Sequence, residues 1–308
     1  MNLKQIEYFV AVCEEGSLSA AAVRLNCTGP GMSQQMSGLE TRLGVILFDR
    51  TSRGVTPTDA GRRFYDRCLI ILKTVREAEN EIEDFKGGIY GSLSVGFAPG
   101  VAKSILPQAL TRFTKEFPQV DIDIASGTAD ALVAATSNGT LDFYVGQFIE
   151  PQIGLTAEPI GRYPVGLLSG SGLGFEPMKP VNLAKMPPLK LFVPSAINSL
   201  KPKIEDAIRH GEILLDRRIS IDSLAAGIEF IAQADWSAIL PYWICLKELD
   251  NKKITINPIA QPFMQVDVAL IYPTKRPISR TSKLFYQYFI EELQRTEEQW
   301  QRLTAHQP

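Results

Sequence analysis

Histidine is scarce in this chain and long apolar runs are absent. Only His210 and His306 occur among the 308 residues, so neither a histidine-rich metal site nor a Ser–His or Cys–His catalytic pair is expected. No run of 18 or more apolar residues exists, which argues against a membrane-spanning helix. The nucleophile-elbow pattern G-x-S-x-G is also missing. These absences predict that the chain is not an enzyme and uses no metal or cofactor.

An excess of positive charge is lacking as well. The net charge is −2, and residues 1–60 hold five Lys/Arg against six Asp/Glu. Any case for nucleic-acid binding must therefore rest on pattern and placement, not on bulk charge. Glu7, Glu14 and Glu15 lie beside the first apolar run, unlike in a signal peptide, which predicts a cytoplasmic protein.

Cysteine is sparse and scattered, at positions 13, 27, 68 and 245. No two of the four stand at metal-ligand spacing, and scattered cysteines of this kind are most often small buried side chains. A redox-sensing role is the alternative. A chain of this length, with 45% hydrophobic and 21% charged residues, is typical of an ordinary globular protein with two or three domains.

The stretch from Thr58 to Phe85 predicts one long helix. Its apolar residues follow alternating steps of four and three, the pattern of a coiled-coil seam. They are Phe64, Cys68, Ile71, Val75, Ala78, Ile82 and Phe85. Thr58 and Asp59 supply a start signal, Gly87-Gly88 a stop signal, and the helix would be about 40 Å long. We interpret residues 59–88 as a linker and dimerisation helix. The alternative is an amphipathic helix packed on its own domain.

The first 45 residues predict three short helices. Apolar positions from Leu3 to Val10 define the first, which ends at Gly16, and Ser17 or Ser19 begins an alanine-rich second. Thr28 caps the third, with Pro30 in its first turn. One face of the third helix is apolar and the other is short and polar. This arrangement is typical of a helix-turn-helix whose polar face reads base edges, while its N-terminus receives a phosphate.

A small β-hairpin is expected directly afterwards. Residues 45–48 predict a strand, residues 49–54 a turn with Arg50 and Arg53 near its tip, and residues 55–58 a second strand. Together with the helices, this order favours a winged helix-turn-helix over residues 1–58. The predicted DNA-binding residues are Thr28, Gly29, Pro30, Gly31, Ser33, Gln34, Gln35, Ser37, Arg50 and Arg53.

Residues 89–308 alternate between strand and helix patterns. Strands are expected at 92–97, 120–125, 141–146, 163–168, 189–193, 218–221, 238–241 and 266–271, and helices at 102–116, around 132–135, at 198–210, after Asp222 and at 279–302. Such alternation predicts parallel sheets with helical crossovers. We expect two α/β lobes, about 91–161 with 266–308 and about 162–265, with a cleft between them.

Ligands in such folds bind beyond the carboxyl ends of the strands, where helices begin. That rule selects loops rich in hydroxyl, amide and apolar groups. The predicted effector-binding residues are Pro99, Gly100, Val101, Ser104, Thr128, Gln147, Phe148, Ser195, Ala196, Asn198, Asp222 and Met264. Simple helix capping is the alternative for each Ser and Thr. Free N–H groups at helix starts favour an anionic ligand and apolar walls an aromatic one.

The N-terminal pattern resembles the LysR-type transcriptional regulators. The resemblance is carried by Gly16-Ser17-Leu18-Ser19-Ala20-Ala21-Ala22, Pro30, Ser33-Gln34-Gln35, Leu39-Glu40, Leu43-Gly44, Leu47-Phe48-Asp49-Arg50 and Arg53-Gly54-Val55. The chain departs from the family at Gly29, where Gln is frequent, and at Ser37, where Arg or Lys is frequent. The resemblance implies an effector domain similar to periplasmic solute-binding proteins. It also implies a homodimer, a homotetramer, and RNA polymerase as a partner.

These features predict an α/β multidomain protein: winged helix-turn-helix, long linker helix, and two-lobed effector domain. We expect a sequence-specific DNA-binding transcriptional regulator, switched by a small anionic or aromatic effector. The alternative is a cytoplasmic small-molecule-binding protein with a vestigial DNA-binding domain. An enzyme acting in the cleft is a third hypothesis, disfavoured because no general base or nucleophile pair is evident.

Overall fold

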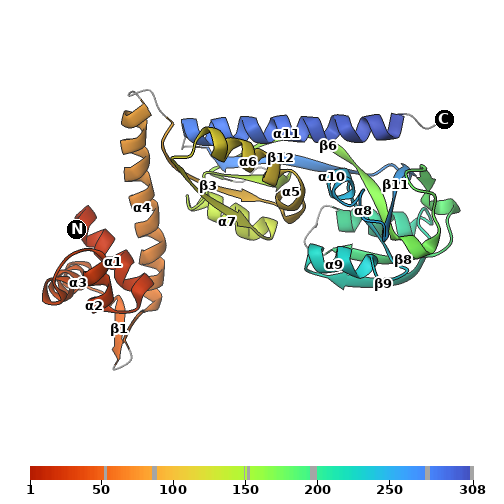
Figure 1. Ribbon diagram of the computed structural model, residues 1–308. Coiled ribbons are helices and arrows are strands. Elements are labelled where there is room, and N and C mark those ends of the chain that lie inside the picture. Colours follow the sequence, from red (N-terminus) through yellow and green to blue (C-terminus); the bar gives the residue numbers. More distant parts are fainter. Residues whose placement is uncertain are drawn as a thin grey trace. The chain divides into compact units, whose positions relative to one another are not determined.

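The protein is described by a computed structural model that covers residues 1–51, 54–84, 89–148, 150, 153–194, 200–274 and 278–305. The chain forms two compact units, Met1–Gly91 and Ser92–Pro308. Figure 1 shows the elements of each unit. None of the helices in the described part of the chain combines the length and apolar content needed to cross a bilayer.

The first unit holds three short helices, a two-stranded hairpin and a long helix. Its elements are α1 (Leu3–Glu15), α2 (Leu18–Arg24), α3 (Gly29–Leu43), β1 (Phe48–Thr51), β2 (Gly54–Pro57) and α4 (Asp59–Asp84). The predicted boundary residues act as expected: Gly16 ends α1 in the left-handed conformation, and Ser17 and Thr28 cap α2 and α3 through their side chains.

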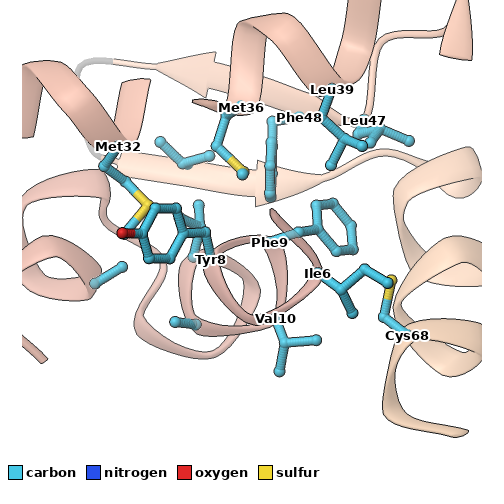
Figure 2. Packing of buried hydrophobic residues seen from close by; sticks show 14 of the residues in the cluster. Ile6, Tyr8, Phe9, Val10, Met32, Met36, Leu39, Leu47, Phe48 and Cys68 are labelled. Atoms are coloured by element: carbon cyan, nitrogen blue, oxygen red, sulfur yellow. The ribbon is translucent and has the colours of Figure 1, made fainter. Parts of the chain in front are cut away.

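A single hydrophobic core joins these elements. Phe9 of α1 lies 5.0 Å, centroid to centroid, from Phe48 of β1 and 4.9 Å from Phe64 of α4. Met32 and Met36 bring the apolar face of α3 onto the same cluster (Figure 2). This core fixes the opposite, polar face of α3 toward solvent.

The predicted first strand of the hairpin was placed too early. The strand begins at Phe48, not at residue 45, so Arg50 lies within β1 and not at the tip of the turn. The cause is Glu40, whose Oε1 accepts hydrogen bonds from the backbone N–H groups of Leu47 (2.9 Å) and Phe48 (3.2 Å). A side chain thus takes the donors that a strand partner would otherwise use. Arg53 lies outside the described residues.

The two halves of the predicted seam on α4 differ in burial. Phe64, Cys68 and Ile71 pack on the core of their own unit, and Cys68 is fully buried. The alternative of an amphipathic helix packed on its own domain therefore holds for this half. Farther along, Ala78 is exposed and the Ile82 side chain is 64% exposed. Phe85 lies outside the described residues.

The second unit contains a ten-stranded mixed sheet with helices on it. The strand order is β4-β3-β5-β12-β6-β10-β8-β9, and β11 pairs with β6 and β7. The strands are β3 (Gly91–Phe97), β4 (Val120–Ser126), β5 (Phe143–Gln147), β6 (Leu155–Gly170), β7 (Val181–Asn182), β8 (Leu189–Pro194), β9 (Leu215–Ile221), β10 (Ser237–Pro241), β11 (Ile254–Gln261) and β12 (Gln265–Pro273). The helices are α5 (Pro99–Ser104), α6 (Leu106–Glu116), α7 (Ala129–Ser137), η1 (Ser171–Leu173), η2 (Leu183–Lys185), α8 (Leu200–Arg209), α9 (Leu224–Ile231), α10 (Tyr242–Lys247) and α11 (Arg280–Ala305).

The long strand β6 links two groups of elements. Its first part pairs with β12 and its last part with β10 and β11, all antiparallel. We call β3–β5, α5–α7 and β12 the first lobe, and β7–β11 with α8–α10 the second lobe. The expectation of parallel sheets with helical crossovers was therefore wrong at β6 and β12, because strands that cross between lobes run against their neighbours. Within each lobe, β3 pairs with β5 and β8 with β9 in parallel, as predicted.

Two further expectations are corrected, and two elements were missed. The single helix at 102–116 is two helices, α5 and α6, that meet at Ile105 because Pro107 supplies no N–H to continue one helix. Ser223, not Asp222, caps α9, since its hydroxyl oxygen accepts from the Ala226 N–H. The short helix α10 and the strand β11 were not predicted.

Candidate functional site

The candidate DNA interface is the solvent-facing side of α3. Ser33 is half-buried, while Gln34, Gln35 and Ser37 are exposed. Thr28 accepts from the Gly31 N–H at 3.3 Å, which orders the start of the helix. Hydroxyl and amide side chains on an exposed helix can pair with base edges, and the first backbone N–H groups can receive a phosphate.

The start of α1 adds residues that the sequence did not single out. Asn2, Lys4, Thr28, Gly31 and Gln35 line one hollow between α1 and α3. The Gln5 Nε2 atom donates to the Gln35 Oε1 atom at 3.1 Å, joining the two helices directly. The only advance signal was the position of Lys4 and Gln5 on the polar face of the first helix. A lysine beside the recognition helix suits a backbone phosphate.

Arg50 is held beside α3. Its Nη2 atom donates to the Ser37 hydroxyl at 3.4 Å and forms an ion pair with the Glu40 carboxylate at 3.4 Å. Its side chain remains 42% exposed. The guanidinium is therefore placed at the edge of the α3 surface, with donors still directed to solvent. Ser37 and Arg50 act as one polar pair.

The candidate effector site is a pocket between the two lobes. It lies beyond the carboxyl ends of β3, β4, β5 and β10 and against β12, the location expected from strand direction. Its lining residues are Ala98, Pro99, Gly100, Val101, Gly127, Ala129, Tyr144, Gly146, Gln147, Pro241, Trp243, Val266, Asp267 and Val268.

Four of the predicted effector residues line this pocket: Pro99, Gly100, Val101 and Gln147. Others lie elsewhere. Thr128 caps α7 between two lining residues, Phe148 packs on the core of the first lobe, and Ser104 is buried and is not part of the pocket lining. Met264 lines a separate hollow beside α8, and Asp222 precedes the cap of α9. Ser195, Ala196 and Asn198 lie outside the described residues.

Sequence reasoning missed the aromatic and acidic part of the lining. Trp243 comes from α10, a helix that was not predicted, and Tyr144 lies inside β5. The Trp243 indole N–H is buried and has no hydrogen-bond partner among the described residues. Burial raises the pKa of Tyr144 to about 12, so its phenol stays neutral at physiological pH.

Asp267 is the one charged residue in the described lining of the pocket. Its carboxylate forms ion pairs with Arg162 of β6 and Lys203 of α8, both at 3.1 Å. Its charge is thus largely compensated from the side opposite the pocket. Around it the walls are apolar or aromatic.

Comparison with known proteins identifies a family for both parts of the chain. The family described as LysR substrate binding domain matches residues 86–294, and the bacterial regulatory helix-turn-helix protein, lysR family, matches residues 3–62. The nitrogen assimilation regulatory protein nac of Escherichia coli (strain K12) is 28% identical over 280 residues, 91% of each chain. The regulator TfdS of Cupriavidus pinatubonensis is 31% identical over 173 residues, 56% of this chain and 59% of that protein.

Solved structures share the fold. Full-length CbnR, crystallised with its target DNA, superposes with a TM-score of 0.69 at 23% identity, covering 96% of this chain and 100% of that chain. Full-length BenM superposes with a TM-score of 0.55 at 18% identity. At these identities the likeness concerns the fold alone.

Proposed function

Because this chain belongs to the LysR family of DNA-binding transcriptional regulators, we propose how its own residues divide that work. Operator DNA is bound by α3 with the start of α1 and with Arg50. A small molecule in the interlobe pocket changes that binding. The observation that carries this proposal is the coexistence of an exposed polar recognition face on α3 with a pocket built from both lobes.

On the DNA, the residues divide into two roles. Ser33, Gln34, Gln35 and Ser37 read base edges in the major groove. The start of α3, from Thr28 through Gly29 and Pro30 to Gly31, holds a phosphate, with Lys4 and Arg50 on neighbouring phosphates. Arg53 belongs to the same predicted set. Gly29 has no side chain and Ser37 has a short one, so sequence specificity depends mainly on Gln34 and Gln35.

For the effector, the lining favours an aromatic compound over a purely anionic one. Tyr144 and Trp243 supply flat walls, and Gly127 leaves open space at the pocket lining. The unpartnered indole N–H of Trp243 favours a hydrogen-bond acceptor on the ligand.

The exposed second half of α4 supports a homodimer. Ala78 and Ile82 continue the heptad spacing but have no core to bury them in the described part of their own unit. We propose that residues 59–85 pair with a second copy, and that two dimers form a tetramer. Two recognition helices would then occupy half-sites one or more helical turns apart. Contact with RNA polymerase in the cytoplasm completes this proposal.

Two variants of the full chain separate the two sites. Gln35→Ala should abolish specific operator binding and leave ligand binding measurable, whereas Gly127→Val, at a lining position with open space around its Cβ, should fill the pocket and leave DNA binding intact. Gel-shift titration with operator and thermal-shift screening with aromatic acids measure the two properties. A chain that keeps its full cellular role after removal of residues 1–90 would instead be a small-molecule-binding protein.

A further inference from the structure

The last helix, α11, continues past the end of the matched family domain. The 26 residues of α11 span about 39 Å, and Figure 1 shows the helix running along α6 and onward beside α10. The LysR substrate binding domain match ends at residue 294. The turns from Arg295 to Ala305 therefore extend beyond the family region.

The first half of α11 is anchored in the first lobe. Phe289 lies 5.1 Å, centroid to centroid, from Phe97 of β3, and both side chains are fully buried. Arg112 of α6 forms ion pairs with Glu291 at 2.6 Å and Glu292 at 2.5 Å. Aromatic packing and paired charges fix this half in place.

The second half of α11 is anchored in the second lobe by one side chain. Trp300 is 5% exposed and lies 5.9 Å, centroid to centroid, from Tyr242 of α10. It also covers Gly166 of β6, where a Cβ atom would stand 3.3 Å from the indole. Tyr242 in turn lies 5.2 Å from Trp243, which lines the interlobe pocket. Three aromatic rings thus connect α11 to the pocket wall.

The opposite side of α10 contacts the first lobe. Lys103 of α5 forms an ion pair with Glu248 at the end of α10, at 2.5 Å. Gly100 of α5 lies against Ile244, since a Cβ atom there would stand 2.8 Å from Ile244 Cδ1. The helix α10 is consequently held between α5 and the end of α11. It carries Trp243 of the pocket wall and Tyr242 directly beside it.

Two buried polar groups on α10 have no partner in the described part of the chain, the Tyr242 hydroxyl and the Trp243 indole N–H. Unsatisfied buried donors carry a free-energy cost that surrounding packing must offset. The packing that offsets it here includes Trp300.

We propose that the last turns of α11 form an interlobe strap, in which Trp300 is a positioning residue for α10 and, through Tyr242, for Trp243 in the pocket wall. The strap adds a third connection between the lobes beside β6 and β12. Its link to effector binding rests on the proposed function, whereas the strap itself does not. A ligand that displaces Trp243 must also shift α10, and hence the seat of Trp300.

Hydrogen exchange of the full-length protein, read by mass spectrometry, tests the strap without DNA or ligand. The key variant replaces two exposed residues between the anchors, Glu298→Gly together with Gln299→Gly. The two glycines lower the helix propensity of α11 at this point and leave both anchors intact. Its matched control is Glu298→Ala with Gln299→Ala. A second pair, Trp300→Ala and Trp300→Phe, removes or retains the aromatic contact.

The readout is exchange in α5, which touches α10 but not Trp300. The strap predicts about tenfold faster exchange of α5 in the glycine pair and in Trp300→Ala, equal to about 1.4 kcal/mol of opening free energy. The alanine pair and Trp300→Phe should stay near the wild-type rate.

Faster exchange confined to α10 and β6 in Trp300→Ala, with α5 unchanged in the glycine pair, would show that Trp300 only fills the second lobe. That result would overturn the strap. Leu183→Ala, which opens a cavity in the second lobe away from α11, calibrates the local effect. Operator binding, measured separately on the same variants, reports on the proposed function and not on the strap.

Discussion

The side-chain amide of Gln5 in α1 donates an N–H to the side-chain Oε1 atom of Gln35 in α3, at 3.1 Å. Gln5 is itself fixed, because its backbone N–H donates to the Asn2 side chain at 2.9 Å. This bond uses one of the two lone pairs on the Gln35 Oε1 atom and holds the amide in one orientation, so Gln35 offers the groove chiefly its N–H donors. A donor alone selects an acceptor such as guanine O6 or N7, whereas an intact free amide can bind adenine through both atoms.

Gln5→Ala should therefore relax operator specificity at the base that faces Gln35. Freeing the Gln35 carbonyl lets it accept from adenine, so discrimination at that position should fall by about 1 kcal/mol or more. Competition binding with operators changed one base pair at a time measures this. Glu7→Ala, an exposed change on the same helix, is the matched control. An unchanged base preference in Gln5→Ala would contradict the positioning role.

Gly61→Ala should severely destabilise the first unit, while Gly38→Ala should stabilise it. A Cβ atom at Gly61 would overlap the Leu47 carbonyl oxygen of the backbone, which cannot move aside cheaply. Gly38 lies in α3 with open space around its Cβ position. The expected change in the free energy of unfolding is a loss of about 3 kcal/mol for the first and a gain of about 1 kcal/mol for the second. Urea unfolding followed by circular dichroism tests both.

Glu40→Ala should loosen the β1–β2 hairpin. The change removes the acceptor for the Leu47 and Phe48 N–H groups and the partner of Arg50. Loss of such bonds should reduce the free energy of unfolding by about 2 kcal/mol, and Glu40→Gln should recover part of it. Equal stability of Glu40→Ala and wild type in urea would show that the carboxylate does not set the start of β1.

The buried thiols give a pH-dependent prediction. Burial raises the pKa of Cys13 and of Cys68 to about 12, from an ordinary value near 9. Because the folded state prefers the neutral thiol, the stabilisation is complete below pH 9 and is lost as the pH rises toward 12. Both thiols should therefore resist iodoacetamide at pH 8 in the folded protein. Rapid alkylation of either one under those conditions would favour the redox-sensing alternative.

Most of the N-terminal unit could be predicted from the sequence, because the residues that begin and end its helices act on their close neighbours in the chain. Gly16, Ser17 and Thr28 act as caps through their immediate neighbours; Gly16 and Thr28 were predicted in place, and Ser17 was one of two candidates with Ser19. The start of β1 was not, because it depends on Glu40, which lies seven residues before Leu47 along the chain. Likewise the alternation of apolar residues along α4 reveals a seam but not which half of it is buried.

The interlobe pocket was only partly predictable. The rule on strand ends selected Pro99, Gly100, Val101 and Gln147, because β3 and β5 are strongly patterned strands. Trp243 was missed because α10 is a six-residue, mostly apolar helix directly after β10, which leaves no periodicity to detect. The strap contact of Trp300 depends on tertiary packing between segments more than fifty residues apart.

The most direct test of the account is a DNase footprint on the DNA upstream of this protein's own gene. It should be run at two salt concentrations, with and without a panel of aromatic acids and small carboxylates. We predict protection of two spaced half-sites that is stronger at low salt, is lost in Gln35→Ala, and is shifted by one aromatic compound in wild type but not in Gly127→Val. The absence of protection at low salt, on this DNA and on genomic fragments, would contradict operator binding through α3.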